Sequence, residues 1–125
     1  MIDDGLDHSY LNELIALGPV EGLVLVRDLI EIFFAEVPAR MDQMRRGLME
    51  CDCGRVLRAA HAMRGGAGNL GAVGLASLCD QVEQQAGREE PTGLGLLLDA
   101  MEVELIRVDH ALAQRLAMIS RAVTQ

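Results

Sequence analysis

The chain has 125 residues, which is enough for one domain with a sizeable hydrophobic core, and its formal net charge is −8. Hydrophobic residues make up 50% of it and aromatic residues 2%. Leu, Ala, Met and Glu far outnumber β-branched residues, which favours helices over strands. The acidic balance, with no basic cluster beyond Arg45 and Arg46, argues against a nucleic-acid partner. No apolar run reaches the ~18 residues of a transmembrane helix, so we also expect no membrane partner.

The three cysteines, Cys51, Cys53 and Cys79, form an odd number in a chain without a secretory signal. This predicts free thiols in a reducing compartment, and therefore a cytoplasmic location. The segment Cys51-Asp52-Cys53 lacks the two-residue gap and the second ligand pair of a structural zinc site, so we expect no bound metal.

Residues that typically begin or end helices divide the chain into helical segments. A short N-terminal helix is expected at about residues 7–17, with Asp7 or Ser9 as its cap and Gly18-Pro19 at its end. From Val20 to Met49, apolar residues recur every three or four positions, as on one face of a helix. Pro38 interrupts this pattern and is expected to kink the helix or to start a new one.

Three further helices are predicted after the turn at residues 51–54. The next helix runs to about Asn69 and is ended by a hinge at Gly71. Another covers roughly residues 72–87, and a polar loop at 88–93 leads into the last helix, which continues almost to the C-terminus. The apolar residues of the last helix are Leu97, Met101, Val103, Leu105, Val108, Leu112, Leu116 and Ile119.

Four long amphipathic helices with short connections predict an all-α fold, an antiparallel up-and-down four-helix bundle at about residues 20–121 with the short N-terminal helix added. We expect a single domain over residues 1–125 and a monomer. The initial Met1 and the lack of a trailing linker favour a free-standing protein over an excised domain.

The most informative segment is His61-Ala-Met-Arg-Gly-Gly-Ala-Gly-Asn-Leu-Gly71. Gly65, Gly66 and Gly68 each lower the stability of a helix by about 1 kcal/mol relative to Ala. A requirement other than helix formation therefore accounts for these glycines. On a helical wheel at about 100° per residue, His61 lies opposite the apolar arc. Gly65, Gly68 and Gly54 fall beside it and leave the surface around His61 bare. Gly66 points towards the core. The alternative, close packing of a second helix, should use the apolar face instead.

Residues 66–71 also match the GxGxxG pattern of dinucleotide-binding proteins. That site needs a preceding strand and a helix that opens after it. The residues before Gly66 are helical in pattern, and no segment is rich in strand-forming residues. We therefore exclude nucleotide binding at this segment.

The segment resembles the signature of histidine phosphotransfer (HPt) domains, in which a histidine is followed by an apolar residue, a basic residue three positions on, small residues and a Leu-Gly pair. Phe33-Phe34 before Pro38 resembles the family as well. Arg64 stands where lysine is commoner, and Gly66 and Ala67 stand where hydroxyl residues are frequent. The resemblance covers most of the chain. It implies that His61 is phosphorylated.

Two side chains are predicted to assist His61. Glu83 follows it by 22 residues, where the family often places a glutamine or glutamate facing the histidine. Its wheel position is at the rim of the apolar stripe, so an ordinary solvated glutamate stays possible. Arg64, one turn after His61, can offset charge on phosphoryl oxygens, or be a solvated arginine. Residues of the surrounding surface are expected to dock the partner: Leu57, Arg58, Gly65 and Gly68.

The resemblance implies a phosphorelay intermediate that accepts a phosphoryl group from an aspartyl phosphate of a receiver domain and passes it to a response regulator. Its partners are receiver domains and a hybrid sensor histidine kinase. The sequence has no nucleotide-binding motif and no acidic cluster beside His61. We therefore expect neither kinase nor phosphatase activity. We also expect no cofactor in this chain, with Mg²⁺ bound only by the receiver domain. The alternatives are a helical docking module that is not phosphorylated and the phosphohistidine domain of a chemotaxis-type kinase.

Overall fold

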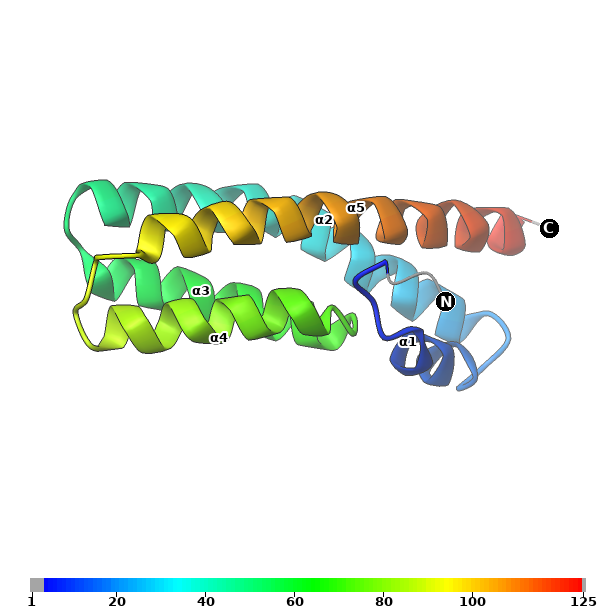
Figure 1. Ribbon diagram of the computed structural model, residues 1–125. Helices are drawn as coiled ribbons and strands as arrows, with labels where there is room; N and C mark the ends of the chain where they lie inside the picture. Colours follow the sequence, from blue (N-terminus) through cyan, green and yellow to red (C-terminus); the bar gives the residue numbers. More distant parts are fainter. Residues whose placement is uncertain (1–3, 125) are drawn as a thin grey trace.

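The computed structural model describes residues 4–124, and this part of the chain holds five helices and no strand (Figure 1). The all-helical prediction is confirmed. The ends of the predicted domain, residues 1–3 and 125, lie outside the described residues. The helices are α1 (His8–Ile15), α2 (Glu21–Met49), α3 (Cys53–Asn69), α4 (Val73–Gly87) and α5 (Leu94–Thr124).

Helix α1 is shorter than predicted and is capped by Asp7, whose carboxylate accepts hydrogen bonds from the backbone N–H and the hydroxyl of Ser9. The helix packs on the start of α2 and buries Leu11 completely. Gly22 allows this contact, because a Cβ at that position would overlap the backbone carbonyl of Ile15. The predicted short N-terminal helix is therefore an accessory to α2.

Helix α2 runs without interruption through Pro38. The prediction that a new helix could start there is wrong. Proline removes one backbone donor and clashes with the preceding turn, but the apolar residues before and after it belong to one buried stripe, Val26, Ile30, Phe33, Val37, Met41 and Met44. Figure 1 shows that the first part of α2 runs obliquely to the rest, so the helix bends along its length.

The four long helices pack so that each contacts two others: α3 lies against α2 and α4, and α5 lies against α2 and α4. Helices α2 and α5 extend beyond the ends of α3 and α4, and α1 lies beside the extension of α2 (Figure 1). Each fully buried Leu or Val contributes about 1.5–3 kcal/mol by leaving water. Val103 departs from the predicted apolar stripe of α5, since its side chain is 70% exposed. The largest fully buried side chains include Ile30, Met44, Leu70, Leu75, Leu94, Leu98, Met101 and Leu112.

Gly71 ends α3, as predicted from the sequence, and it does so in the left-handed region at φ 74°. The N–H of Ala72 donates to the carbonyl of Ala67, and the N–H of Gly71 donates to the carbonyl of Gly68. This is a Schellman motif, which satisfies carbonyls left open at a helix end. The carbonyl of Gly71 in turn accepts a hydrogen bond of 2.7 Å from the N–H of Asp7. The end of α3 is therefore tied to the start of α1.

We expect Asp109→Asn to stabilise the protein at neutral pH. One carboxylate oxygen of Asp109, on α5, is buried without a hydrogen-bond partner among the described residues, and burial raises the pKa of this carboxyl. A raised pKa means that the folded state favours the protonated form of Asp109. The folded protein therefore loses stability as the pH rises through the pKa of this carboxyl. Thermal unfolding should give a higher Tm for the variant at pH 7 and a smaller difference at pH 4. An equal difference at both pH values would contradict this assignment.

Among residues 4–124, no helix combines the length and the apolar character needed to cross a membrane.

Candidate functional site

His61 lies in the middle of α3 on the face opposite the core, as the helical wheel predicts. The residues of α3 that face inward are all buried, and they are Val56, Ala59, Ala60, Met63 and Ala67. The side chain of His61, by contrast, is 65% exposed. A second protein can therefore reach the imidazole without any change in the fold.

Glu83 on α4 contacts the imidazole directly. Its Oε1 lies 2.6 Å from Nδ1 of His61, although the Glu83 side chain is only 13% exposed. An ionised carboxylate can only accept hydrogen bonds, so Nδ1 carries the proton and donates it to Oε1. The other ring nitrogen, Nε2, then holds the lone pair, and no described residue bonds to it. The contact fixes both the tautomer and the orientation of the ring.

Arg64, on α3, contacts both Glu83 and His61. Its Nε lies 2.8 Å from the buried Oε2 of Glu83, in an ion pair that lacks the alignment of a hydrogen bond. Its Nη1 donates to Oδ1 of Asp80 at 3.2 Å, and its Nη2 lies 3.3 Å from Nδ1 of His61. Because Nδ1 carries a proton, the last approach is a contact between two donors. Arg64 is thus held beside His61 by two carboxylates of α4.

Asp80 also belongs to the site, although it was not predicted from the sequence. The signal that could have found it is its spacing, because Asp80 precedes Glu83 by three residues and so lies on the same face of α4, one turn earlier. Its second carboxylate oxygen accepts a hydrogen bond of 2.9 Å from Gln84. Asp80 positions Arg64, and with it the positive charge next to the imidazole.

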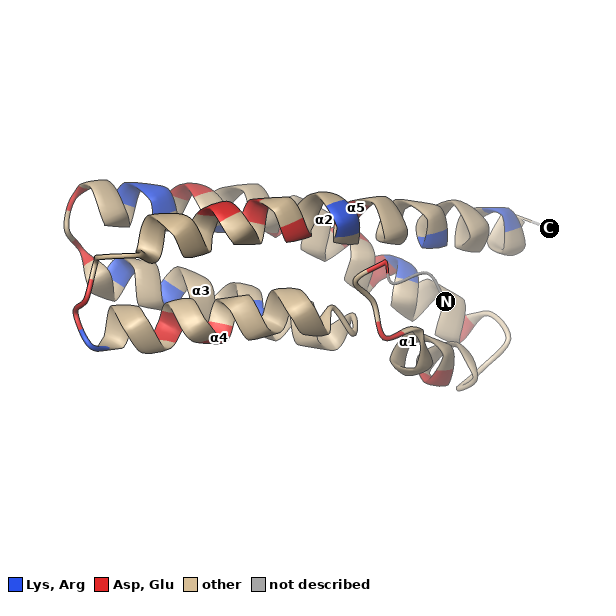
Figure 2. Cartoon of the chain, viewed as in Figure 1, with Lys and Arg blue, Asp and Glu red and all other residues tan. Residues whose placement is uncertain are grey.

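The charged residues of α3 and α4 are separated by sign (Figure 2). Helix α3 contains only basic charged residues, Arg55, Arg58 and Arg64, and α4 contains only acidic ones, Asp80 and Glu83. Both carboxylates of α4 contact the same arginine, Arg64. The other two arginines of α3 therefore receive no charge compensation from α4.

Cys79 lies on α4, one turn before Glu83, and its side chain is fully buried. Burial, together with the charge of the Glu83 carboxylate, raises the pKa of this thiol to about 12. The thiol is therefore uncharged at neutral pH and is a core side chain beneath the site. All three cysteines of the chain are free.

The glycines near His61 differ in what surrounds them. A Cβ built on Gly65 or Gly68 would meet nothing within 4 Å, so the predicted bare surface exists at these two positions. A Cβ on Gly66 would lie 3.5 Å from the ring of Phe33, which agrees with its predicted direction towards the core. The prediction for Gly54 is wrong. A Cβ there would lie 3.3 Å from Nη1 of Arg58. The space above Gly54 is therefore occupied by that guanidinium and is not part of a bare surface around His61.

The two other predicted docking residues lie on opposite sides of α3. Leu57 is half-buried, and its Cδ1 would be 3.4 Å from a Cβ placed on Gly87, so it faces the end of α4. Arg58 is exposed and lies over Gly54. Neither residue forms a hydrogen bond to the imidazole of His61, whose polar contacts among the described residues are with Glu83 and Arg64.

The chemistry available here is nucleophilic. An exposed nitrogen lone pair with a fixed tautomer can attack an electrophile, and a carboxylate 2.6 Å from the other ring nitrogen stabilises the positive charge that the ring then gains. The arginine beside it can offset negative charge on transferring oxygens, as in phosphoryl transfer.

We expect Glu83→Ala to slow attack by Nε2 of His61 on a phosphoryl donor by about 10- to 100-fold, by analogy with metal-binding histidines that lose the group orienting the ring. Circular dichroism should show an intact fold, because the side chain lies at the edge of the core. Glu83→Gln keeps an acceptor for the Nδ1 proton but not the charge, so its rate should lie between the two. Gln81→Ala, at an exposed position of the same helix, is the matched control. A wild-type rate in Glu83→Ala would make Glu83 an ordinary surface residue.

Comparison with known proteins shows the family of this chain. The model of the Hpt domain family matches residues 28–122. The crystal structure of histidine-containing phosphotransfer protein B from Pseudomonas aeruginosa PAO1 is similar, with a TM-score of 0.81 and 28% sequence identity, over 91% of this chain and 96% of that one. A comparison with curated proteins gives no match. The family match covers most of the chain, including the helices that carry His61, Arg64 and Glu83, and the chain therefore belongs to the Hpt domain family, with a histidine phosphotransfer role in phosphorelays.

Proposed function

We propose that this protein accepts a phosphoryl group on His61 from the aspartyl phosphate of a receiver domain and passes it to a response regulator. The observation that carries the proposal is the contact between His61 and Glu83. It leaves Nε2 as the nucleophilic nitrogen on an imidazole that is 65% exposed. Family membership supports the same role.

In the proposed step, the lone pair of Nε2 attacks phosphorus, the bond between phosphorus and the aspartyl oxygen breaks, and the donor aspartate leaves as a carboxylate. The ring now carries a positive charge, which the carboxylate of Glu83 stabilises through Nδ1–H. Arg64 supplies positive charge beside the phosphoryl oxygens. Transfer to the response regulator is the same step in reverse, with a second aspartate as the nucleophile.

The chain acts in this proposal as a phosphocarrier without kinase or phosphatase activity of its own. It needs no resident cofactor, because the Mg²⁺ that supports the chemistry of the aspartyl phosphate comes with the receiver domain. A hybrid sensor histidine kinase is the source of the phosphoryl group. The proposed carrier is a monomer in the cytoplasm, a reducing compartment that suits its three free cysteines.

The scaffold of the proposed carrier is an antiparallel up-and-down four-helix bundle of α2 to α5. The packing of each of these helices against two others supports this arrangement. It holds α3 and α4 side by side, so that the histidine of one and the glutamate of the other meet at the surface. The docking surface proposed around them consists of Leu57, Arg58, Gly65 and Gly68, and its bare glycines allow the concave site of a receiver to approach the imidazole closely.

The direct test is a transfer experiment. Purified receiver domains are phosphorylated with acetyl phosphate, freed of the donor and mixed with this protein, and the label on each protein is followed with time. We expect a phosphoryl group on this chain that is labile to acid and stable to alkali, as phosphohistidine is. A stable complex with a receiver but no such label would instead favour the docking module that is not phosphorylated.

A further inference from the structure

A surface hollow between α2 and α3 is lined by three arginines. It has a volume of about 370 Å³, and its lining residues are Arg40, Gln43, Arg55, Arg58 and Ala59. We call it the arginine hollow. It begins one helical turn from the reactive histidine, because Arg58 precedes His61 by three residues on α3. Of the three arginines, only Arg58 was predicted to belong to the docking surface. Arg40 comes from α2 and joins Arg55 and Arg58 only in the fold.

The positive charge of the arginine hollow is largely uncompensated. Arg58 has no ion pair or hydrogen bond to any described residue, and Arg40 only donates a hydrogen bond of 3.3 Å to the amide oxygen of Gln43. Arg55 pairs with Glu50 at 3.2 Å, at the surface, where such a pair contributes at most about 1 kcal/mol. These three arginines are among the 11 basic residues of a chain whose net charge is −8.

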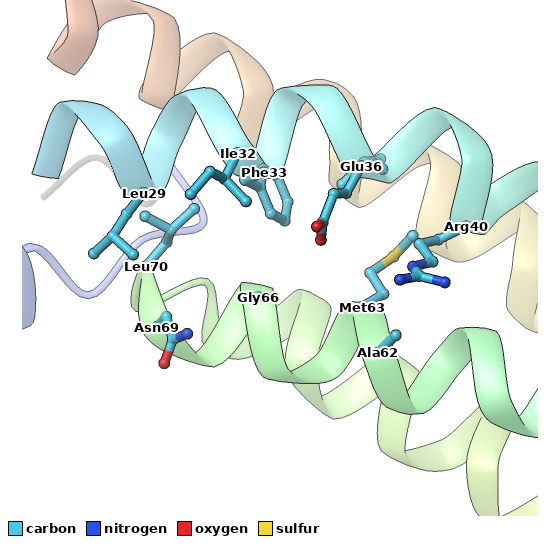
Figure 3. A pocket seen from close by; sticks show the side chains of 11 residues that line it. Leu29, Ile32, Phe33, Glu36, Arg40, Ala62, Met63, Gly66, Asn69 and Leu70 are labelled. Atoms are coloured by element: carbon cyan, nitrogen blue, oxygen red, sulfur yellow. The ribbon is translucent and has the colours of Figure 1, made fainter. Parts of the chain in front are cut away.

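The arginine hollow continues into an apolar one. A second hollow, of about 50 Å³, lies between the same two helices and shares Arg40 with the first (Figure 3). Phe33 and Gly66 line it, and Ile32, exposed to 54%, stands at its edge. We call it the apolar slot. The groove between α2 and α3 thus changes from mostly apolar at one end, where Glu36 is the one carboxylate in the lining, to cationic at the other, with Arg40 at the junction.

We propose that the arginine hollow binds an acidic surface of the receiver domain that exchanges a phosphoryl group with His61. This inference rests on the proposed function and adds the chemistry of the partner surface. Guanidinium groups pair well with carboxylates, and three of them on two helices fit a carboxylate-rich protein edge. The arginine hollow is open and polar, whereas sites for small molecules are more enclosed and mostly apolar. A protein surface is therefore the better occupant.

The surrounding charge gives this contact a role in orientation. The chain as a whole is acidic and repels an acidic partner, while the arginine hollow attracts it at one place beside His61. Complementary patches of this kind steer encounter and fix the register of docking more than they add affinity. Salt screens such an attraction, so transfer should weaken as ionic strength rises.

The experiment compares two phosphoryl donors. One is the receiver domain that labels the wild-type chain fastest, and the other is phosphoramidate, a small donor that needs no docking. For each variant the ratio of the second-order rate constants for the two donors is measured, at NaCl concentrations from low to high. The variants are Arg58→Gln and the double substitution Arg40→Gln with Arg58→Gln. The matched control is Arg121→Gln, which removes the same charge from an exposed position in the last turn of α5.

We expect the ratio to fall about fivefold or more in the double variant, less in Arg58→Gln, and not at all in Arg121→Gln. The salt dependence of transfer from the receiver should be weaker in the double variant than in the wild type. An unchanged ratio and an unchanged salt dependence would overturn the inference and leave the proposed function intact. Strong inhibition by millimolar inorganic phosphate at constant ionic strength would overturn it in favour of a small-anion site. If neither donor labels the wild type, the proposed function fails and the inference fails with it.

Discussion

His61→Gln should abolish phosphoryl transfer from a receiver domain to this protein. Glutamine offers no nitrogen nucleophile, because its amide lone pair is delocalised, while its size and polarity suit the exposed position. The side chain is 65% exposed, and glutamine can still donate a hydrogen bond towards Glu83, so the fold should not change. The measurement is the label on the chain after incubation with a phosphorylated receiver, together with circular dichroism and thermal unfolding.

His110→Gln is the control for this experiment. His110 is exposed on α5, and among residues 4–124 its hydrogen-bond partner is the side chain of Gln114, at 3.3 Å. The control should accept the phosphoryl group at the wild-type rate. If His61→Gln were still labelled, the phosphoryl group would reside on another residue and the proposed function would need a different site.

Much of the fold was predictable from the sequence, because hydrophobic spacing and helix-ending residues are local signals. The predicted ends of α3, the helix that contains the glycine run, agree with the structure to within one or two residues. Asp52 caps its start and Gly71 ends it. The continuity of α2 through Pro38 was not predictable in this way. It depends on packing of the helix against α3 and α5, and such tertiary contacts outweigh a local preference.

Three residues of the candidate site, His61, Arg64 and Glu83, were predicted from the sequence, but their geometry was not. The spacing of His61 and Glu83 suggested a pair, yet a wheel placed Glu83 only at a rim, and the 2.6 Å contact depends on how α4 lies against α3. Asp80 and Arg40 were missed for the same reason. Each is an ordinary charged surface residue on its own helix, and each becomes informative only through a partner on another helix.

Alanine in place of glycine should have opposite effects on stability at Gly65 and Gly71. At Gly71 the backbone has φ 74°, and a Cβ would lie 2.5 Å from the carbonyl oxygen of Asp7. The left-handed conformation alone costs a residue with a Cβ about 1–2 kcal/mol, and the clash adds to it, so we expect Gly71→Ala to lower the free energy of unfolding by about 2 kcal/mol or more. Urea unfolding with an unchanged m-value measures this loss. A neutral Gly71→Ala would mean that the junction between α3 and α1 is not held as described.

Gly65→Ala should instead raise the free energy of unfolding by about 1 kcal/mol, because the position is helical and a Cβ there meets nothing within 4 Å. The same methyl group occupies the bare surface beside His61. If the receiver domain docks on that surface, the Gly65→Ala variant should accept a phosphoryl group from a receiver more slowly than the wild type. Its reaction with phosphoramidate should be unchanged. A more stable variant with an unchanged ratio of the two rates would contradict the docking role of Gly65. Stability and docking make opposite demands at this position, and glycine satisfies docking at the expense of the helix.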